Sequence, residues 1–263
     1  MTSCIAFIKK EFLEAVRTGK LLIFILLFSF FGIMNPAIAR VTPWMIEMMA
    51  DSLADTGLTV TGVNVNALTS WTQFYKNIPI AMVIFLLMFS SIFTAEYQRG
   101  TLINMLTKGL NRWKVMLAKA CSMVIFWTGG YWLCYGITYG YTVYFWDNDV
   151  VSYPVFSAFC IYLLGIWLIS LILLSSAVGT TNITVLLMTG AVFGITYLLA
   201  YLLHFLPDFS NLQEYLPVQL FTSDQLLVGA GKPGEYAGAI VVTVVWSALN
   251  AAAAIAWFNR KAL

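Results

Sequence analysis

Residues 155–178 read VFSAFCIYLLGIWLISLILLSSAV, a run without any charged side chain. The run is longer than the roughly 20 residues that a helix needs to cross the hydrocarbon core of a bilayer. A charge at the centre of that core costs at least ~2.5 kcal/mol, so an uncharged run of this length indicates a membrane span. Five further runs share the property: residues 21–39, 78–95, 120–145, 185–205 and 237–258. The sequence therefore predicts an all-α integral membrane protein with six transmembrane helices.

The composition of the whole chain agrees with this fold. Of its 263 residues, 60% are hydrophobic and only 10% are charged, whereas soluble domains carry about 25% charged residues. The six runs leave no room for a separate globular domain, so we expect residues 1–263 to form one transmembrane domain. A net charge of +2 is too small to suggest binding to nucleic acid.

The basic residues predict the orientation of the chain. If the N-terminus lies in the cytoplasm, only Arg40, Lys76 and Lys232 of the 14 lysines and arginines fall on the outer side. Short loops rich in Lys and Arg stay in the cytoplasm. Both termini are therefore predicted to be cytoplasmic, in a multi-pass protein of the plasma (cytoplasmic) membrane.

The segment before the first run has the pattern of a short amphipathic helix. Within residues 3–17, Ile5, Ile8, Phe12 and Leu13 fall near one helical face, and most of the charged residues fall elsewhere. Such a helix lies in the plane of the membrane interface. We expect this one to rest among the inner headgroups.

The sequence offers no catalytic or metal-binding constellation. It lacks the GxxxxGK[ST] phosphate loop, HExxH and GxSxG, the motifs of nucleotide, zinc-peptidase and serine-hydrolase sites. Its single histidine, His204, would stand alone as a ligand or base. The six runs contain no carboxylate, which ion-driven carriers usually hold within the bilayer. We expect no catalytic residue, metal or cofactor in this chain, and a partner as the energy source for any uphill transport.

The most informative connection is residues 94–119, TAEYQRGTLINMLTKGLNRWKVMLAK. A glycine followed by a threonine ends one helix and begins another, because glycine tolerates the turn and threonine caps helix N-termini. An apolar helical face and then basic residues follow. An ordinary basic loop would explain the positive charges but not this order. The residues of the pattern are Glu96, Arg99, Gly100, Thr101, Leu102, Leu106, Arg112 and Lys119.

This pattern resembles the segment between the second and third spans of ABC-2-type permeases, the membrane subunits of a class of ABC exporters. Many members read Glu-x-x-x-Gly-Thr, then a Leu-Thr-Pro-like turn, then Arg and Lys. This chain has residues 108–110, Lys-Gly-Leu, where proline is frequent. The resemblance extends to the N-terminal helix, the six spans and the cytoplasmic termini.

The resemblance implies a division of labour between subunits. In the family, the loop after the second span docks on a separate ATP-binding cassette ATPase, which binds ATP and magnesium. The short loop between the fourth and fifth spans makes a second contact, which corresponds here to Thr180 and Asn182. The segment between the fifth and sixth spans often re-enters the outer leaflet, and residues 212–228 with Pro217 match it.

Two permease subunits face each other in this family, with the first and fifth spans at the seam. Gly190 and Gly194 lie four residues apart in the fifth run, and Ser29 and Gly32 have similar spacing in the first. Small residues at this spacing let helices approach closely. They could form a seam with an identical or a related subunit, or pack within one subunit.

A stripe of aromatic residues in the third run also has two interpretations. Trp127, Tyr131, Tyr135 and Tyr139 recur every four residues and so share one face of a helix. The stripe could contact an apolar or amphipathic cargo, or it could pack between helices.

The sequence thus predicts the permease subunit of an ATP-driven ABC transporter, which by analogy with short family members exports a peptide, an antimicrobial or another small or amphipathic cargo. Two alternatives stay open: a membrane-embedded enzyme or maturation factor, and a stand-alone carrier or channel. The missing catalytic residues disfavour the first. The missing intramembrane charge and the pattern of residues 94–119 disfavour the second.

Overall fold

The computed structural model describes residues 2–54, 65–98, 100, 111–205 and 210–260. This part of the chain is helical throughout and contains no β-strand. The long helices are α1 (Thr2–Arg17), α2 (Lys20–Ala54), α3 (Ala67–Phe89), α4 (Ser91–Gln98), α6 (Arg112–Phe145), α7 (Pro154–Val178), α8 (Asn182–His204) and α10 (Ala237–Arg260). Shorter helical segments are η1 (Asn148–Val150), α9 (Ser210–Gln213), η3 (Pro217–Val228) and η4 (Pro233–Tyr236).

Five helical stretches are long and apolar enough to cross a membrane: residues 20–49, 67–98, 154–178, 182–203 and 233–260. The prediction of a multi-pass helical membrane protein is confirmed at this level. The expected third span lies in α6, which is not among the five. Its 34 residues are rich in Trp, Tyr and Gly, and these residues lower its mean hydropathy although they carry no charge.

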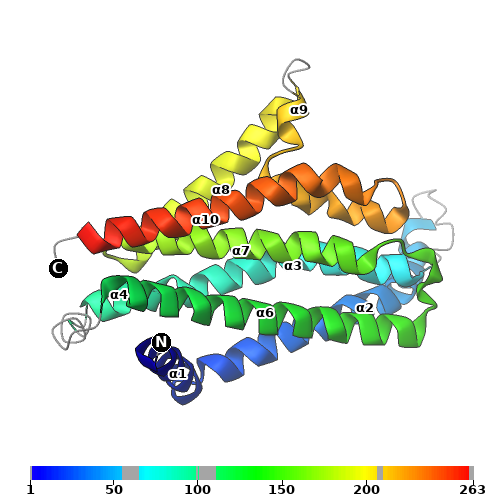
Figure 1. Cartoon of the computed structure of the whole chain (residues 1–263). Helices are drawn as coiled ribbons and strands as arrows, with labels where there is room; N and C mark the ends of the chain where they lie inside the picture. Colours follow the sequence, from blue (N-terminus) through cyan, green and yellow to red (C-terminus); the bar gives the residue numbers. More distant parts are fainter. Residues whose placement is uncertain (1, 55–64, 99, 101–110, 206–209, 261–263) are drawn as a thin grey trace.

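The helices form an elongated bundle, and α1 and the C-terminal end of α10 lie at the same end of it (Figure 1). The turn between α7 and α8 lies at this end too, where α4 contacts α8. Helix α7 is central. In its apolar stretch 78% of the residues are buried, against 17% in the apolar stretch of the span that contains α10. Helix α8 leaves the bundle at an angle and is only 22% buried.

Local sequence explains where several helices begin and bend. Asn66 caps the start of α3, and Thr69 completes a capping box. Thr181 caps α8 through the amide of Thr184. In α2, Pro36 has no amide hydrogen for the carbonyl of Gly32 one turn earlier. The hydroxyl of Thr138 in α6 donates to that carbonyl at 3.1 Å, and so replaces the missing donor.

The packing of the bundle corrects the interpretation of the aromatic stripe as facing a cargo. Trp127 and Tyr131 are completely buried, and Tyr135 is nearly so. The indole of Trp127 packs over Gly165 of α7, where a Cβ would overlap the ring, and donates to the carbonyl of Tyr162. Only Tyr139 is exposed, at 42%. The spacing correctly placed these residues on one face, but three of the four fill the interior between helices.

The segment expected to re-enter the membrane packs against α7. In η3, Ser223 donates to the carbonyl of Ser157 at 3.2 Å, and the Ser157 hydroxyl donates back to the carbonyl of Ser223. The Ser152 amide donates to the carbonyl of Leu227 at 3.1 Å. These bonds hold η3 against the first turns of α7.

Helix α1 packs on the bundle through a face other than the predicted apolar one. Phe7 and Ala15 are buried, whereas Ile5, Phe12 and Leu13 are at least 43% exposed. The predicted apolar face thus remains largely uncovered, and a second, narrower face packs on α6.

Candidate functional site

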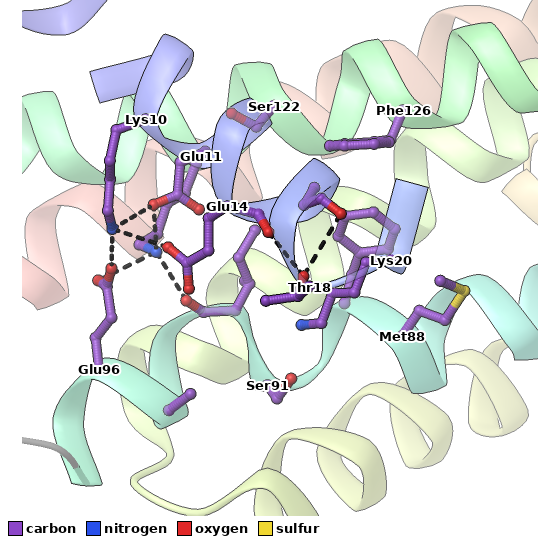
Figure 2. Close-up of a pocket in the computed structure, with 15 residues that line it drawn as sticks. Lys10, Glu11, Glu14, Thr18, Lys20, Met88, Ser91, Glu96, Ser122 and Phe126 are labelled. Atoms are coloured by element: carbon purple, nitrogen blue, oxygen red, sulfur yellow. Dashed lines mark hydrogen bonds and ion pairs between the residues drawn. The ribbon is translucent and has the colours of Figure 1, made fainter. Parts of the chain in front are cut away.

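Five charged side chains meet at the end of the bundle that holds α1 and the end of α10. Lys10, Glu11 and Glu14 come from α1, Glu96 from α4 and Lys119 from α6. We call this group the ionic clasp. Figure 2 shows the carboxylates of Glu11, Glu14 and Glu96 gathered around the ammonium group of Lys10. The clasp joins three helices that are separate in the sequence.

Lys119 is the buried centre of the clasp, with only 1% of its side chain exposed. Its Nζ lies 3.2 Å from Glu11 Oε1 and 3.1 Å from Glu96 Oε2. It also donates to the carbonyl of Ile92 at 2.8 Å. A buried ammonium without partners would cost several kcal/mol, so these three acceptors make its position tenable.

Lys10 connects the same carboxylates from the more exposed side. Its Nζ lies 2.8 Å from Glu96 Oε1, 3.1 Å from Glu11 Oε1 and 3.3 Å from Glu14 Oε2. Burial lowers the pKa of the Lys10 ammonium, but the hydrogen bond to Glu96 and the attraction of Glu11 together raise that pKa well above its usual value. Lys10 is therefore positively charged at neutral pH.

The clasp borders a cavity of about 240 Å³ between α1, α4 and α6. Thr18 and Ser91 add hydroxyl groups to its wall, and Met88 and Phe126 add apolar surface. Lys20, at the start of α2, also lines it. The lining of this cavity therefore comes from five helices around the clasp: α1, α2, α3, α4 and α6.

The three carboxylates of the clasp have oxygens within 4.8 Å of one another, a spacing that could hold a metal ion. However, Lys10 and Lys119 already lie between these oxygens. A cation would have to displace both ammonium groups. The arrangement fits an internal link between helices better than a metal centre, and it offers no nucleophile paired with a base.

The structure corrects the expected role of Lys119, which the sequence placed on the basic rim of a docking segment. Lys119 is buried, and Glu96 is buried beside it. Gly100 adopts a left-handed conformation with φ 65°, as expected where the chain leaves α4. Arg99, Thr101, Leu102 and Leu106, the remaining members of that segment before residue 111, lie outside the described residues.

Arg112 begins α6 and reaches the last turn of α10. Its Nη1 donates to the carbonyls of Phe258 at 3.4 Å and Asn259 at 3.5 Å. A cation at a helix C-terminus satisfies carbonyls that lack helical partners and interacts favourably with the helix dipole. Arg112 thus ties the segment 94–119 to the C-terminal helix.

The second expected contact lies in the turn between α7 and α8. Thr180 is exposed, and Asn182 is half-buried at the start of α8. Within the described part of the chain, the side-chain oxygen of Asn182 has no hydrogen-bond partner. The turn lies at the same end of the bundle as the clasp, because α4 contacts α8 there.

The predicted seam residues divide into two groups. Gly32 is buried within the chain, where an added Cβ would lie 2.9 Å from Ile137 Cβ of α6. The structure therefore corrects the prediction for Gly32, and Ser29 is only half-exposed. Gly190 and Gly194 are exposed, with nothing within 4 Å of an added Cβ.

Sequence reasoning missed Lys10, Glu11 and Glu14 as site residues. The available signal was the mixed charge of α1, where two lysines precede two glutamates within an amphipathic helix. Charges on an interfacial helix usually face water, so their spacing alone does not show that one of them meets a buried lysine more than a hundred residues later.

Comparison with known proteins adds no family assignment. A scan against protein-family models and a search of curated proteins both found no match for this chain.

Proposed function

We propose that this chain is the membrane-spanning permease subunit of an ATP-driven ABC exporter of the ABC-2 type. The ionic clasp is the observation that carries the proposal. It joins α1 to the two helices that flank residues 99–111, the segment that resembles a coupling loop. A push on that segment would be transmitted to α1, α4 and α6 together.

The path of α6 supports six crossings with cytoplasmic termini. Helix α6 runs along the bundle from the end of α4 to the beginning of α7 (Figure 1). Its 34 residues extend about 51 Å, more than the ~30 Å core requires. With α6 included, both termini lie on one side, and the basic residues select the cytoplasm. In this arrangement, η3 would dip into the outer leaflet beside α7.

Energy would come from a separate ATP-binding cassette ATPase, which would bind ATP and magnesium. It would dock on residues 99–111 and on the turn with Thr180 and Asn182, which lies at the end of the bundle where α4 contacts α8. A peptide, an antimicrobial or another small or amphipathic molecule is the proposed cargo. A second permease subunit, identical or related, would complete the transmembrane unit.

Co-purification tests the proposal. The tagged chain would be extracted from its native membrane with a mild detergent after reversible crosslinking, and its partners would be identified by mass spectrometry. We expect a subunit with a phosphate loop, and ATP hydrolysis by the complex but not by the chain alone. Leu102→Asp would place a charge in the docking segment and should remove that subunit, whereas the exposed Tyr144→Ser should not. A complex without any ATPase would contradict the proposal.

A further inference from the structure

A groove runs along one side of the bundle between α3 and α8, with η3 as part of its wall. Two cavities of about 290 and 470 Å³ compose it, and a third of about 420 Å³ adjoins them between α8 and η3. Phe221 lines all three, and Phe193 lines the first two, so the cavities are next to one another. We call this the α3–α8 groove. Its α8 wall belongs to the helix that diverges from the bundle (Figure 1).

The inner part of the groove is apolar. Helix α3 contributes Met82 and Leu86, and α8 contributes Gly190, Phe193 and Gly194 to the 290 Å³ cavity. The two glycines leave open space, because an added Cβ would meet nothing within 4 Å. Ligand pockets for small molecules typically begin at about 300 Å³. This part therefore has room for one alkyl chain.

Thr189 is the single hydroxyl residue of this inner part, and its hydroxyl is already bonded. Its Oγ1 donates to the Ser175 hydroxyl at 3.1 Å in the interior. The inner part thus presents a hydrocarbon surface. An uncharged, chain-like group fits it, whereas a charged group would lose its hydration without compensation.

The outer part carries opposite charges on its two walls. Lys76 of α3 and Asp224 of η3 both line the 470 Å³ cavity. Within the described part of the chain, neither forms an ion pair within 4.0 Å. Burial raises the pKa of Asp224, although backbone hydrogen bonds from Gln225 and its own amide oppose the rise. An ammonium and a carboxyl group in one cavity are complementary to a ligand that carries both signs of charge.

The two parts match one leaflet of a membrane in depth. At a rise of 1.5 Å per residue, Leu86 lies about 15 Å along α3 from Lys76. The hydrocarbon core of a bilayer is about 30 Å thick, so the groove from Lys76 to Leu86 is about as deep as one leaflet.

We propose that the α3–α8 groove binds a single-chain zwitterionic amphiphile. Its alkyl chain occupies the apolar part beside Gly190 and Gly194, and its anionic and cationic head groups pair with Lys76 and Asp224. Because α8 is mostly exposed, the ligand enters sideways from the outer leaflet.

Binding of fluorescent lysophosphatidylcholine to the purified chain in maltoside micelles tests this proposal. Gly190→Leu/Gly194→Leu fills the apolar part and should weaken binding at least about tenfold, equivalent to ~1.4 kcal/mol. Gly136→Leu is the matched control. It adds a side chain at another exposed helical glycine with open space around it, outside the groove, and should leave binding unchanged.

The head group is tested separately by charge. Lys76→Glu should weaken binding of lysophosphatidylcholine, and Asp224→Asn should shift preference toward anionic lysophosphatidylglycerol. The exchange Lys76→Asp/Asp224→Lys retains both charges and should restore most of the lysophosphatidylcholine binding. Equal binding of lysophosphatidylcholine by the wild type, Gly190→Leu/Gly194→Leu and Lys76→Glu would overturn the proposal.

A second copy of the chain is the competing occupant of this surface. A dimer by light scattering that Gly190→Leu/Gly194→Leu dissociates, without binding of the lipid probe, would also overturn the proposal. The assay needs neither ATP nor an ATPase, so its failure would leave the proposed permease function standing.

Discussion

The Lys119 ammonium lies 3.1 Å from the Glu96 carboxylate, so the end of α4 and the early part of α6 are held together. Glu96 lies in the last turn of α4, and Lys119 lies near the beginning of α6. Their pairing fixes the two ends of residues 99–111 relative to each other. A partner that binds this segment therefore acts on both helices.

Removing the Lys119 ammonium should destabilise the protein by about 3–5 kcal/mol, because two buried carboxylates would lose their central partner. Denaturant unfolding of Lys119→Met in detergent micelles measures the change. Adding Glu96→Gln should recover part of the loss, since one buried charge is then removed. If the double variant loses as much unfolding free energy as the two single variants together, the two residues are not coupled. Lys9→Met on the exposed side of α1 is the control.

Lys10 should stabilise the fold at neutral pH and lose this effect only in alkali. Its folded pKa lies above the ordinary value of about 10.4, so the stabilisation is complete below pH ~10.4. It declines as the pH rises from there toward the folded pKa. Thermal unfolding between pH 8 and 11.5 should show a steeper loss for wild type than for Lys10→Arg, whose guanidinium stays protonated. Parallel curves would contradict this assignment.

Thr138→Val should cost about 1–3 kcal/mol, because it removes a donor from the Gly32 carbonyl and an acceptor from the buried Asn35 amide, now 3.0 Å away. Thr138→Ser keeps the hydroxyl and should cost much less. Pro36→Ala restores the amide that bonds Gly32 within α2, so Thr138→Val should cost less in that background. An identical cost in both backgrounds would show that Thr138 does not compensate for the amide hydrogen that Pro36 lacks. Thermal unfolding in micelles measures all four variants.

Gly165→Ala and Gly136→Ala should differ although each adds one methyl group. At residue 165 the methyl would overlap the Trp127 indole, and overpacking of this kind costs about 1–3 kcal/mol. At residue 136 nothing lies within 4 Å, so we expect no loss. The melting temperatures of the two purified variants provide the measurement, and Trp127→Phe should lessen the cost of Gly165→Ala. Equal melting temperatures would place Trp127 elsewhere.

A reporter fused after Val151 should respond as an external fusion, because the proposed crossing by α6 precedes it. A fusion after Arg260 should report the cytoplasm. A cytoplasmic signal at residue 151 would mean that α6 does not cross and would overturn the six-span topology.

The helices were predictable wherever an uncharged run was long. Helix α7 begins at residue 154 and ends at residue 178, and both ends lie within one residue of the ends of the uncharged run. Helix α2 contains the predicted span but continues beyond it to residue 54. The uncharged run stops before Arg40, but the helix need not end there. A charged side chain is costly in the bilayer core, whereas a helix tolerates it.

The clasp was less predictable than the helices. Lysine is normally exposed, so Lys119 was expected on a surface, and only the packing of α1 against α4 and α6 shows why it can be buried. The aromatic residues of α6 show the same limit. Their spacing determines that Trp127 and Tyr131 share a face, but only Gly165 of the neighbouring helix decides what that face meets.

The clasp also sets an order for biosynthesis. Lys10 and Glu11 leave the ribosome long before Lys119, and domains assemble as their parts emerge. During that interval Glu11 has no buried partner and α1 must wait in water or at the headgroups. Helix α1 can pack in its final position only after Lys119 of α6 has been synthesised, so α1 in a nascent chain stalled before residue 119 should still be cleaved by proteases.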